Sequence, residues 1–91
     1  MAITIKVTQE DIDKGKRANC FACPIALASM RAFGLPLDAG HVEAYGLFIG
    51  SFVNGGEYIR YHTPIETIRF MNDFDQGLLV SPFEFELTEL Y

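Results

Sequence analysis

The chain has 91 residues, and its 12 acidic and seven basic side chains give a formal net charge of −5. This acidity opposes binding to phosphate backbones and argues against a direct nucleic-acid partner. Nearly half of the residues are apolar, which excludes intrinsic disorder, and no apolar run approaches the roughly 20 residues that span a bilayer. The length allows one small domain, residues 1–91.

The opening segment predicts a strand over residues 2–7, because apolar and polar residues alternate there. It lacks the charged start and apolar centre of a secretory signal, so the expected location is the cytoplasm. Thr8 and Asp11 have the spacing of a capping box. They predict a short helical turn that ends near Gly15.

A nearly uniformly apolar run follows the two cysteines, Cys20 and Cys23. Pro24 suits the first position of a helix, where its missing N–H costs nothing, so Cys23 falls at the N-cap. We expect a buried helix from about Cys23 to Phe33, ended by Gly34.

Residues 42–53 are almost continuously apolar and predict one long strand with a bulge at one of its glycines. The Asn-Gly-Gly sequence at 54–56 is typical of a tight hairpin. A second strand over Glu57–His62 is therefore expected to pair back in the antiparallel direction.

The last third of the chain predicts a helix and a strand. Thr63-Pro64-Ile65-Glu66 combines an N-cap, a proline at the first helical position and a glutamate at the third, and Gly77 ends the helix. The alternation Phe83-Glu84-Phe85-Glu86-Leu87-Thr88 predicts a half-buried strand.

The predicted order is β-α-β-β-α-β, which indicates an α+β domain. A ferredoxin-like fold, a small antiparallel sheet with helices on one face, is the simplest arrangement of this order. A long bent hairpin that projects from a smaller sheet is the alternative.

The cysteine pair admits three interpretations. A zinc site would need Cys20, Cys23, His41 and His62 as its four ligands, but the histidine spacing matches no compact finger. A redox site is the second, because thiols near a helix N-terminus and near basic residues favour the thiolate. The third is two small hydrophobic groups that pack at a helix entrance. The third is the ordinary role of cytosolic cysteine and the one we expect, and with it no bound metal and no cofactor.

Enzymatic activity is not expected. No Ser–His–Asp spacing stands out, and no glycine-rich phosphate loop occurs, because the paired glycines belong to a predicted hairpin tip.

The strand pair around the hairpin is the predicted contact surface for a protein partner. Tyrosine and arginine dominate binding hot spots because they bury a large area and keep a polar group. The candidate residues are Phe52, Tyr58, Arg60 and Tyr61. Tyr58 and Tyr61 are three apart, so on a strand they face opposite sides and at least one packs into the core. The apolar run 42–53 also predicts a homodimer, because so small a core can hardly cover both faces of such a strand.

Three segments resemble small uncharacterised proteins encoded by bacteriophages and prophages. They read VTQEDIDKG at 7–15, CFACPIALA at 20–28 and FDQGLLVSPFEFEL at 74–87. The resemblance implies a phage origin and an intracellular setting, with no functional residue to carry over. Many small acidic phage proteins bind and inhibit a host protein, and this is the leading hypothesis: a non-enzymatic binding module that inhibits a host metabolic or defence protein. The alternatives are a thiol-redox or zinc protein and a sensor that binds a small ligand between sheet and helices.

Overall fold

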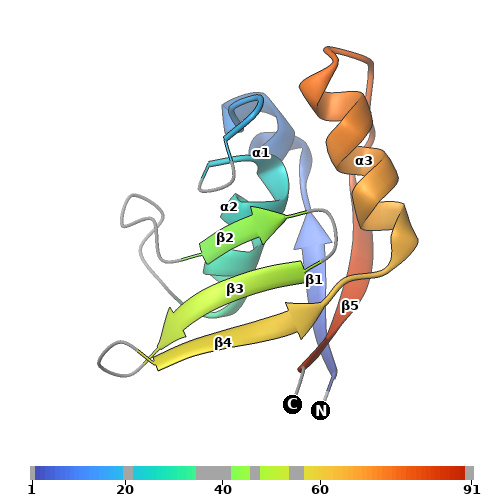
Figure 1. Ribbon diagram of the computed structural model, residues 1–91. Helices are drawn as coiled ribbons and strands as arrows, with labels where there is room; N and C mark the ends of the chain where they lie inside the picture. The colour runs from blue at the N-terminus through green and yellow to red at the C-terminus, as the bar shows by residue number, and fades with distance from the viewer. Residues whose placement is uncertain (1, 20–21, 35–41, 46–47, 54–56, 90–91) are drawn as a thin grey trace.

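The computed structural model describes residues 2–19, 22–34, 42–45, 48–53 and 57–89. In these residues the chain forms one antiparallel sheet with the strand order β1-β5-β4-β3-β2, together with three helices (Figure 1). The strands are β1 (Ala2–Val7), β2 (Val42–Tyr45), β3 (Phe48–Val53), β4 (Glu57–His62) and β5 (Phe83–Glu89), and the helices are α1 (Gln9–Lys14), α2 (Pro24–Ala32) and α3 (Ile65–Asp75). The predicted α+β class and the antiparallel sheet are thus confirmed.

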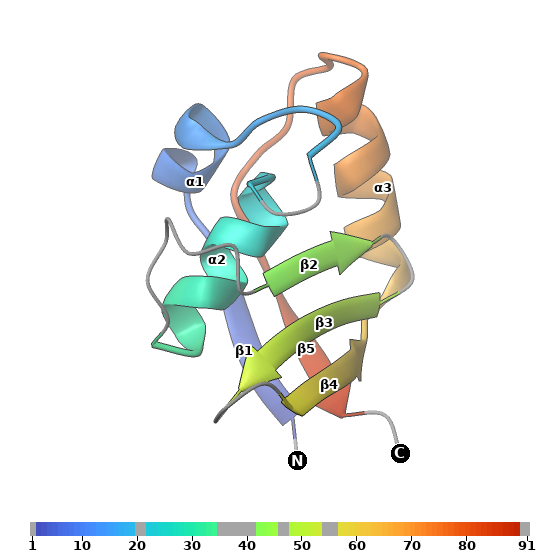
Figure 2. The same cartoon turned by 60° about the vertical axis from the view of Figure 1, so that its left-hand side comes forward.

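The sheet bends sharply between β4 and β5. The pairs β1–β5 and β3–β4 are in register over six positions each, whereas β4 and β5 pair at Tyr61↔Glu89 and His62↔Thr88. Figure 2 shows β1 and β5 crossing behind β2, β3 and β4. The sheet therefore has two parts that differ in direction and enclose a concave side.

The strand order differs from the predicted ferredoxin-like arrangement. In that fold the first strand lies inside the sheet, whereas here β1 is at the edge and pairs with the last strand, β5. The single strand predicted over 42–53 is also wrong, because β2 and β3 are separate strands that pair antiparallel up to Tyr45↔Phe48. A continuous apolar run has the same appearance whether it forms one long strand or two short ones.

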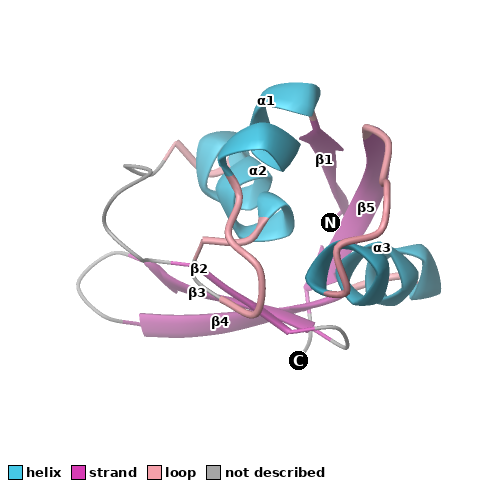
Figure 3. Cartoon of the chain, turned by 90° about the horizontal axis from the view of Figure 1, so that it is seen from above, coloured by secondary structure: helices cyan, strands magenta, loops and turns pink. Residues whose placement is uncertain are grey.

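The core lies on the concave side of the sheet, called the inner face below. Alternate strand positions contribute its buried apolar side chains, which are Ile5, Val7, Val42, Ala44, Ile49, Tyr61, Phe85 and Leu87. Helix α2 contacts β1 and β2 and adds Ile25, Ala26, Ala28 and Met30 to this core. Seen from above, α1 and α2 lie on one side of β2, β3 and β4 (Figure 3).

Helix α3 reaches the same core through aromatic rings. The ring of Phe70 lies 4.9 Å from that of Phe83, and the ring of Phe83 lies 5.5 Å from that of Phe85. Phe70 and Thr67 are the buried residues of this helix, whose other sides carry mostly polar groups. Phe70 is thus the one buried apolar side chain of α3, and Met71 and Phe74 pack against the same core from half-buried positions.

The ends of α1 and α2 follow the local rules of the sequence. The capping box is present: the Thr8 N–H donates to Asp11 Oδ2 over 2.8 Å, and the Asp11 N–H donates to Thr8 Oγ1 over 3.3 Å. Cys23 is the N-cap of α2, and Pro24 is its first residue, as predicted. Gly34 follows the helix with a φ of +73°, a conformation that suits glycine.

Helix α3 begins one residue later than predicted and ends as predicted. Pro64 is its N-cap, with no side-chain cap, and Thr63 is buried instead of capping the helix. At the other end Gly77 has a φ of +80° and donates its N–H to the Phe74 carbonyl over 3.0 Å. The Leu78 N–H donates to the Asp73 carbonyl over 2.9 Å, which completes a Schellman motif. None of the helices in the described part of the chain is long and apolar enough to cross a membrane.

Candidate functional site

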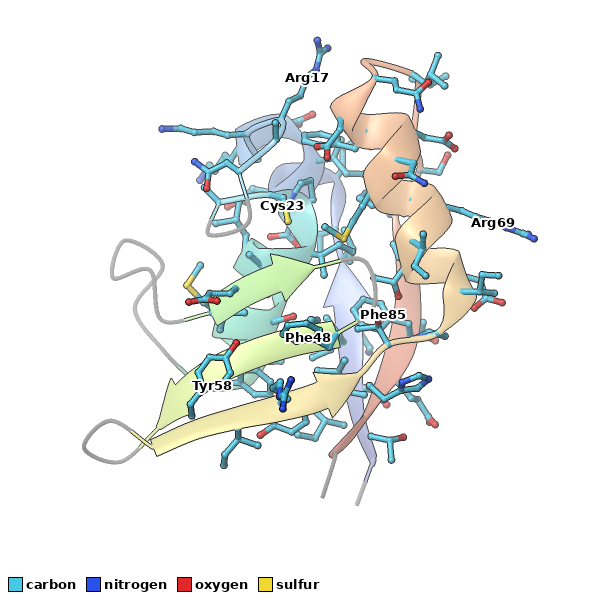
Figure 4. All side chains as sticks on the ribbon, in the orientation of Figure 1. Arg17, Cys23, Phe48, Tyr58, Arg69 and Phe85 are labelled. Carbon is cyan, nitrogen blue, oxygen red and sulfur yellow. The ribbon has the colours of Figure 1, made fainter. Side chains whose placement is uncertain are left out.

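The convex side of β2, β3 and β4, called the outer face below, carries none of the three helices found in the described residues. In Figure 1, α1 and α2 lie behind this half of the sheet and α3 lies to its right; in Figure 4, drawn in the same orientation, Phe48 and Tyr58 lie over β3 and β4 on the near side. Strand alternation places Ile59 and Tyr61 toward the core and Tyr58 and Arg60 on the outer face. The antiparallel register sets Gly50 opposite Arg60.

Tyr58 is held against the backbone of its neighbouring strand. A Cβ atom added at Gly50 would overlap the Tyr58 hydroxyl, so the phenol ring lies over the space that glycine leaves open. The Tyr58 hydroxyl donates a long hydrogen bond of 3.4 Å to Glu43 Oε2 on β2. The side chain still has 39% of its surface exposed, so it can contact a partner with little loss of rotamer freedom.

Arg60 lies beside Tyr58 on the same face and over an aromatic ring. Its Cζ atom is 5.6 Å from the ring centroid of Phe48, within the range of a cation–π contact. Phe48 is half-buried and Arg60 is exposed. The outer face therefore presents a phenol, a guanidinium and a phenyl ring, with the Glu43 carboxylate at the β2 edge.

The other half of the convex side has a different chemistry. The described side chains of β1 and β5 that point away from the core are polar; they are Thr4, Lys6, Glu84, Glu86 and Thr88. They are exposed, as expected for a solvated sheet face. Among the described residues, the aromatic groups of the convex side thus gather on β3 and β4.

Two of the four predicted contact residues share the outer face. Tyr61 does not: it is buried on the inner face, where its ring stacks on that of Phe33 with centroids 5.4 Å apart. Phe52 pairs in register with Tyr58, but its side chain lies outside the described set. Tyr58 and Tyr61 thus face opposite sides of the sheet, as strand alternation predicts.

Sequence reasoning missed Phe48, Glu43 and Gly50 as members of this surface. Phe48 and Gly50 lie in an apolar run that was expected to form one strand, and Glu43 was not connected with Tyr58. The signal that joins them is the register of β2, β3 and β4, which depends on where the chain reverses.

The cysteine and histidine candidates are not brought together where the structure describes them. Cys23 has 3% of its surface exposed and belongs to the core, whereas His62 is exposed at the end of β4 on the opposite face of the sheet. Cys20 and His41 lie outside the described residues. No group of three or more His, Cys, Asp or Glu residues within the described ranges could hold a metal ion.

An ion pair between Asp11 and Arg31 lies next to the core. Arg31 donates to both carboxylate oxygens of Asp11, over 2.6 Å and 2.8 Å, and to the Lys6 carbonyl over 2.8 Å. Burial by itself raises the pKa of Asp11, but the hydrogen bonds and charge of Arg31, together with the hydrogen bonds from Thr8, hold this pKa below its usual value. The hydrogen bond to Asp11 raises the pKa of Arg31. This pair ties α1 to α2 and to β1, which is a structural role.

No protein-family model, curated protein or solved structure matches this chain. The geometry of the outer face is therefore the main guide to function. What the fold and this face define is a small acidic α+β protein with one aromatic, helix-free side of its sheet.

Proposed function

We propose that the protein is a non-enzymatic binding module that engages a protein partner through the outer face of β3 and β4. The observation that supports this is the position of Tyr58 and Arg60, which are fixed by Gly50 and Phe48 on a sheet face without helices. Tyrosine and arginine in such rigid, half-exposed positions are typical of binding hot spots. A sheet whose uncovered side is aromatic in one half and polar in the other favours contact in the aromatic half.

The partner in this proposal is a host protein of metabolism or defence, which the small acidic chain inhibits by occupying its surface. The resemblance to phage-encoded proteins supports this part of the proposal, and it covers 7–28 and 74–87. The outer face of β3 and β4 lies outside those segments. The resemblance therefore supports the biological setting, and the geometry supports the surface.

The experiment compares variants of the outer face with a matched variant of the polar half. A tagged wild-type chain first captures the partner from host lysate, and the affinity of the purified pair is then measured by calorimetry. Replacing both Tyr58 and Arg60 with alanine should weaken binding by about 1–2 kcal/mol or more, roughly 5- to 30-fold. Replacing Thr4 and Glu86 with alanine, two exposed positions on β1 and β5, should leave the affinity unchanged.

A third variant tests whether the fixed position of Tyr58 matters. Gly50→Ala places a methyl group where the Tyr58 hydroxyl lies, so the phenol must swing away while the strand keeps its hydrogen bonds. Binding should weaken although Tyr58 and Arg60 are both present. If the Tyr58/Arg60 variant and Gly50→Ala both bind at full strength, the contact surface lies elsewhere on the molecule.

A further inference from the structure

The segment between α3 and β5 exposes two adjacent leucines. Leu79 has 99% of its surface exposed and Leu78 has 54%, in a region held by the Schellman hydrogen bonds at the end of α3. Single exposed leucines are common on protein surfaces. Two in succession, beside an apolar depression, are less ordinary and point to a contact.

The depression is a cleft between α1 and this segment, with a volume of about 400 Å³. Its apolar wall consists of Ile12, Phe74 and Val80, and the two leucines form its border. The cavity left by removing one leucine side chain from a core is about 150 Å³ and accepts a benzene ring. The cleft therefore has room for two leucine side chains.

The rim of the cleft carries charges of both signs. Asp13 on α1 and Arg17 just after it are both exposed and line the cleft. Gln9 donates to the Asp13 carboxylate over 2.9 Å, and the Arg17 guanidinium lies against Gly77, 3.1 Å from where a Cβ atom would be. One acidic and one basic group thus have defined positions on either side of an apolar depression.

A projecting leucine, a depression with room for it and charges of both signs on one surface are features that a twofold self-contact can use. In a twofold dimer the same surface of both copies forms the contact: if one residue contacts a second residue of the other copy, the reverse contact is also made. This surface must therefore be complementary to itself. Leu79 of one copy can enter the cleft of the other. Asp13 of each copy then lies near Arg17 of its mate, which pairs the charges twice.

We propose that the occupant of this cleft is a second copy of the same chain, and that Leu78 and Leu79 anchor a twofold homodimer. The chain has an accessible surface of 5504 Å², and a standard interface takes roughly 800 Å² from each partner. Nine residues line the cleft, fewer than the roughly 20–30 residues that each side of a standard interface contributes, so we expect a weak dimer that exchanges readily, with a dissociation constant in the micromolar range or above.

This contact is separate from the outer face described above. Figure 4 shows Arg17 at one end of the molecule, whereas Tyr58 lies toward the other. The dimer also does not use the run 42–53, on which the sequence-based expectation of a homodimer depended. Two chains joined at the cleft would present two outer faces. A variant that no longer dimerises can therefore still be tested for partner binding, and a variant that no longer binds the partner can still be tested for dimerisation.

The first test measures mass by sedimentation velocity from about 1 µM to about 1 mM, the range over which a weak dimer forms. The wild-type chain should shift from monomer to dimer, and Leu79→Asp should raise the dissociation constant at least tenfold. Ile65→Asp is the matched control, because Ile65 is a 57% exposed apolar residue at the other end of α3. A wild-type chain that stays monomeric, or a Leu79→Asp chain that dimerises like the control, overturns the proposal.

The second test uses the twofold pairing of charges. Asp13→Arg alone sets arginine against arginine in both halves of the contact, and Arg17→Asp alone sets aspartate against aspartate, so each variant should self-associate less than wild type. An equimolar mixture of the two should form heterodimers, because both contacts are then of opposite sign. A mixture that associates no better than either variant alone contradicts the twofold contact. Circular dichroism checks that both variants fold.

Discussion

Asp11 takes part in two local structures at once, the capping box of α1 and the ion pair with Arg31. Its carboxylate is almost fully buried, and about half of the Arg31 side chain is exposed. Solvent around the guanidinium weakens the attraction, so the pair contributes less than a fully buried one. The carboxylate nevertheless needs its charge, because Arg31 and the Thr8 N–H both donate to it.

Acid should therefore remove a specific part of the stability. The pKa of Asp11 is lower in the folded chain than in the unfolded chain, so its contribution is complete above the unfolded pKa of about 3.9 and is lost as the pH falls through the lower, folded pKa. Asp11→Asn should cost about 1–2 kcal/mol at pH 7 and much less near pH 2, as urea titrations at both pH values can measure.

Glu10 supplies the control for this prediction. It pairs with Lys14 over 3.0 Å, but about 70% of each side chain is exposed. Exposed pairs contribute little, so Glu10→Gln should leave the stability almost unchanged at both pH values. Equal losses in the two variants would mean that the Asp11–Arg31 pair has no special role.

Substitution by alanine should affect stability differently at Gly15 and at Gly50. A Cβ atom at Gly15 would lie 2.5 Å from Cδ of Pro24, so it would overlap the proline ring at the start of α2. At Gly50 the added atom would instead overlap the outer end of the Tyr58 side chain. A proline ring in a helix N-terminus cannot swing aside. Gly15→Ala should therefore lower the free energy of unfolding by about 1–3 kcal/mol, while Gly50→Ala changes it little. Urea denaturation of the two variants gives the comparison directly.

At the scale of elements, α3 depends mainly on Phe70, its one buried apolar side chain, to which Met71 and Phe74 add half-buried contacts. Phe70 is buried and its ring is tilted against Phe83, while most of the helix surface is polar. Phe70→Ala should cost about 3–4 kcal/mol, because it removes a ring and leaves a cavity between α3 and β5. Hydrogen exchange should then show α3 losing protection before the sheet. Arg69→Ala, a change at an exposed position on the same helix, is the control and should change neither.

Helix ends were predictable because their signals are local. Thr8 with Asp11, Pro24 after Cys23, Gly34 and Gly77 each act within one turn of the chain, and the structure has these features in place. The predicted start of α3 was one residue too early, because Thr63 is buried and does not cap the helix. Local chemistry thus determines where helices begin and end to within about a residue.

The strand order was not predictable in the same way. The split of 42–53 into β2 and β3 depends on a reversal that an apolar run does not mark, and the pairing of β1 with β5 joins segments almost a chain length apart. The composition of the outer face was only partly predictable for the same reason. Residue type and alternation placed Tyr58 and Arg60, but Phe48 and Gly50 became their neighbours only through the cross-strand register.

At the scale of the whole molecule, the two thiols and the two histidines are expected to have no common metal. Cys23 lies in the core and His62 on the other side of the sheet, so these two cannot bind one ion in the folded chain. The purified protein should hold no stoichiometric zinc by mass spectrometry. One equivalent of zinc per chain that is lost in a Cys20→Ser variant would contradict this.

In the Cys20→Ser variant Cys23 should also react with a thiol reagent only as fast as the chain unfolds.

The position of β5 has a consequence for synthesis of the chain. It is the strand neighbour of both β1 and β4, so the sheet closes only when its last strand is available. Seventy-five residues separate Val7 from Phe83, and at about 5–20 residues per second β1 waits on the order of 4–15 s for its partner. During this time the apolar side of β1 has no completed sheet to join. A nascent chain that pauses before residue 83 would therefore be exposed to chaperones and to aggregation, although β1, β2, β3 and β4 had already been made.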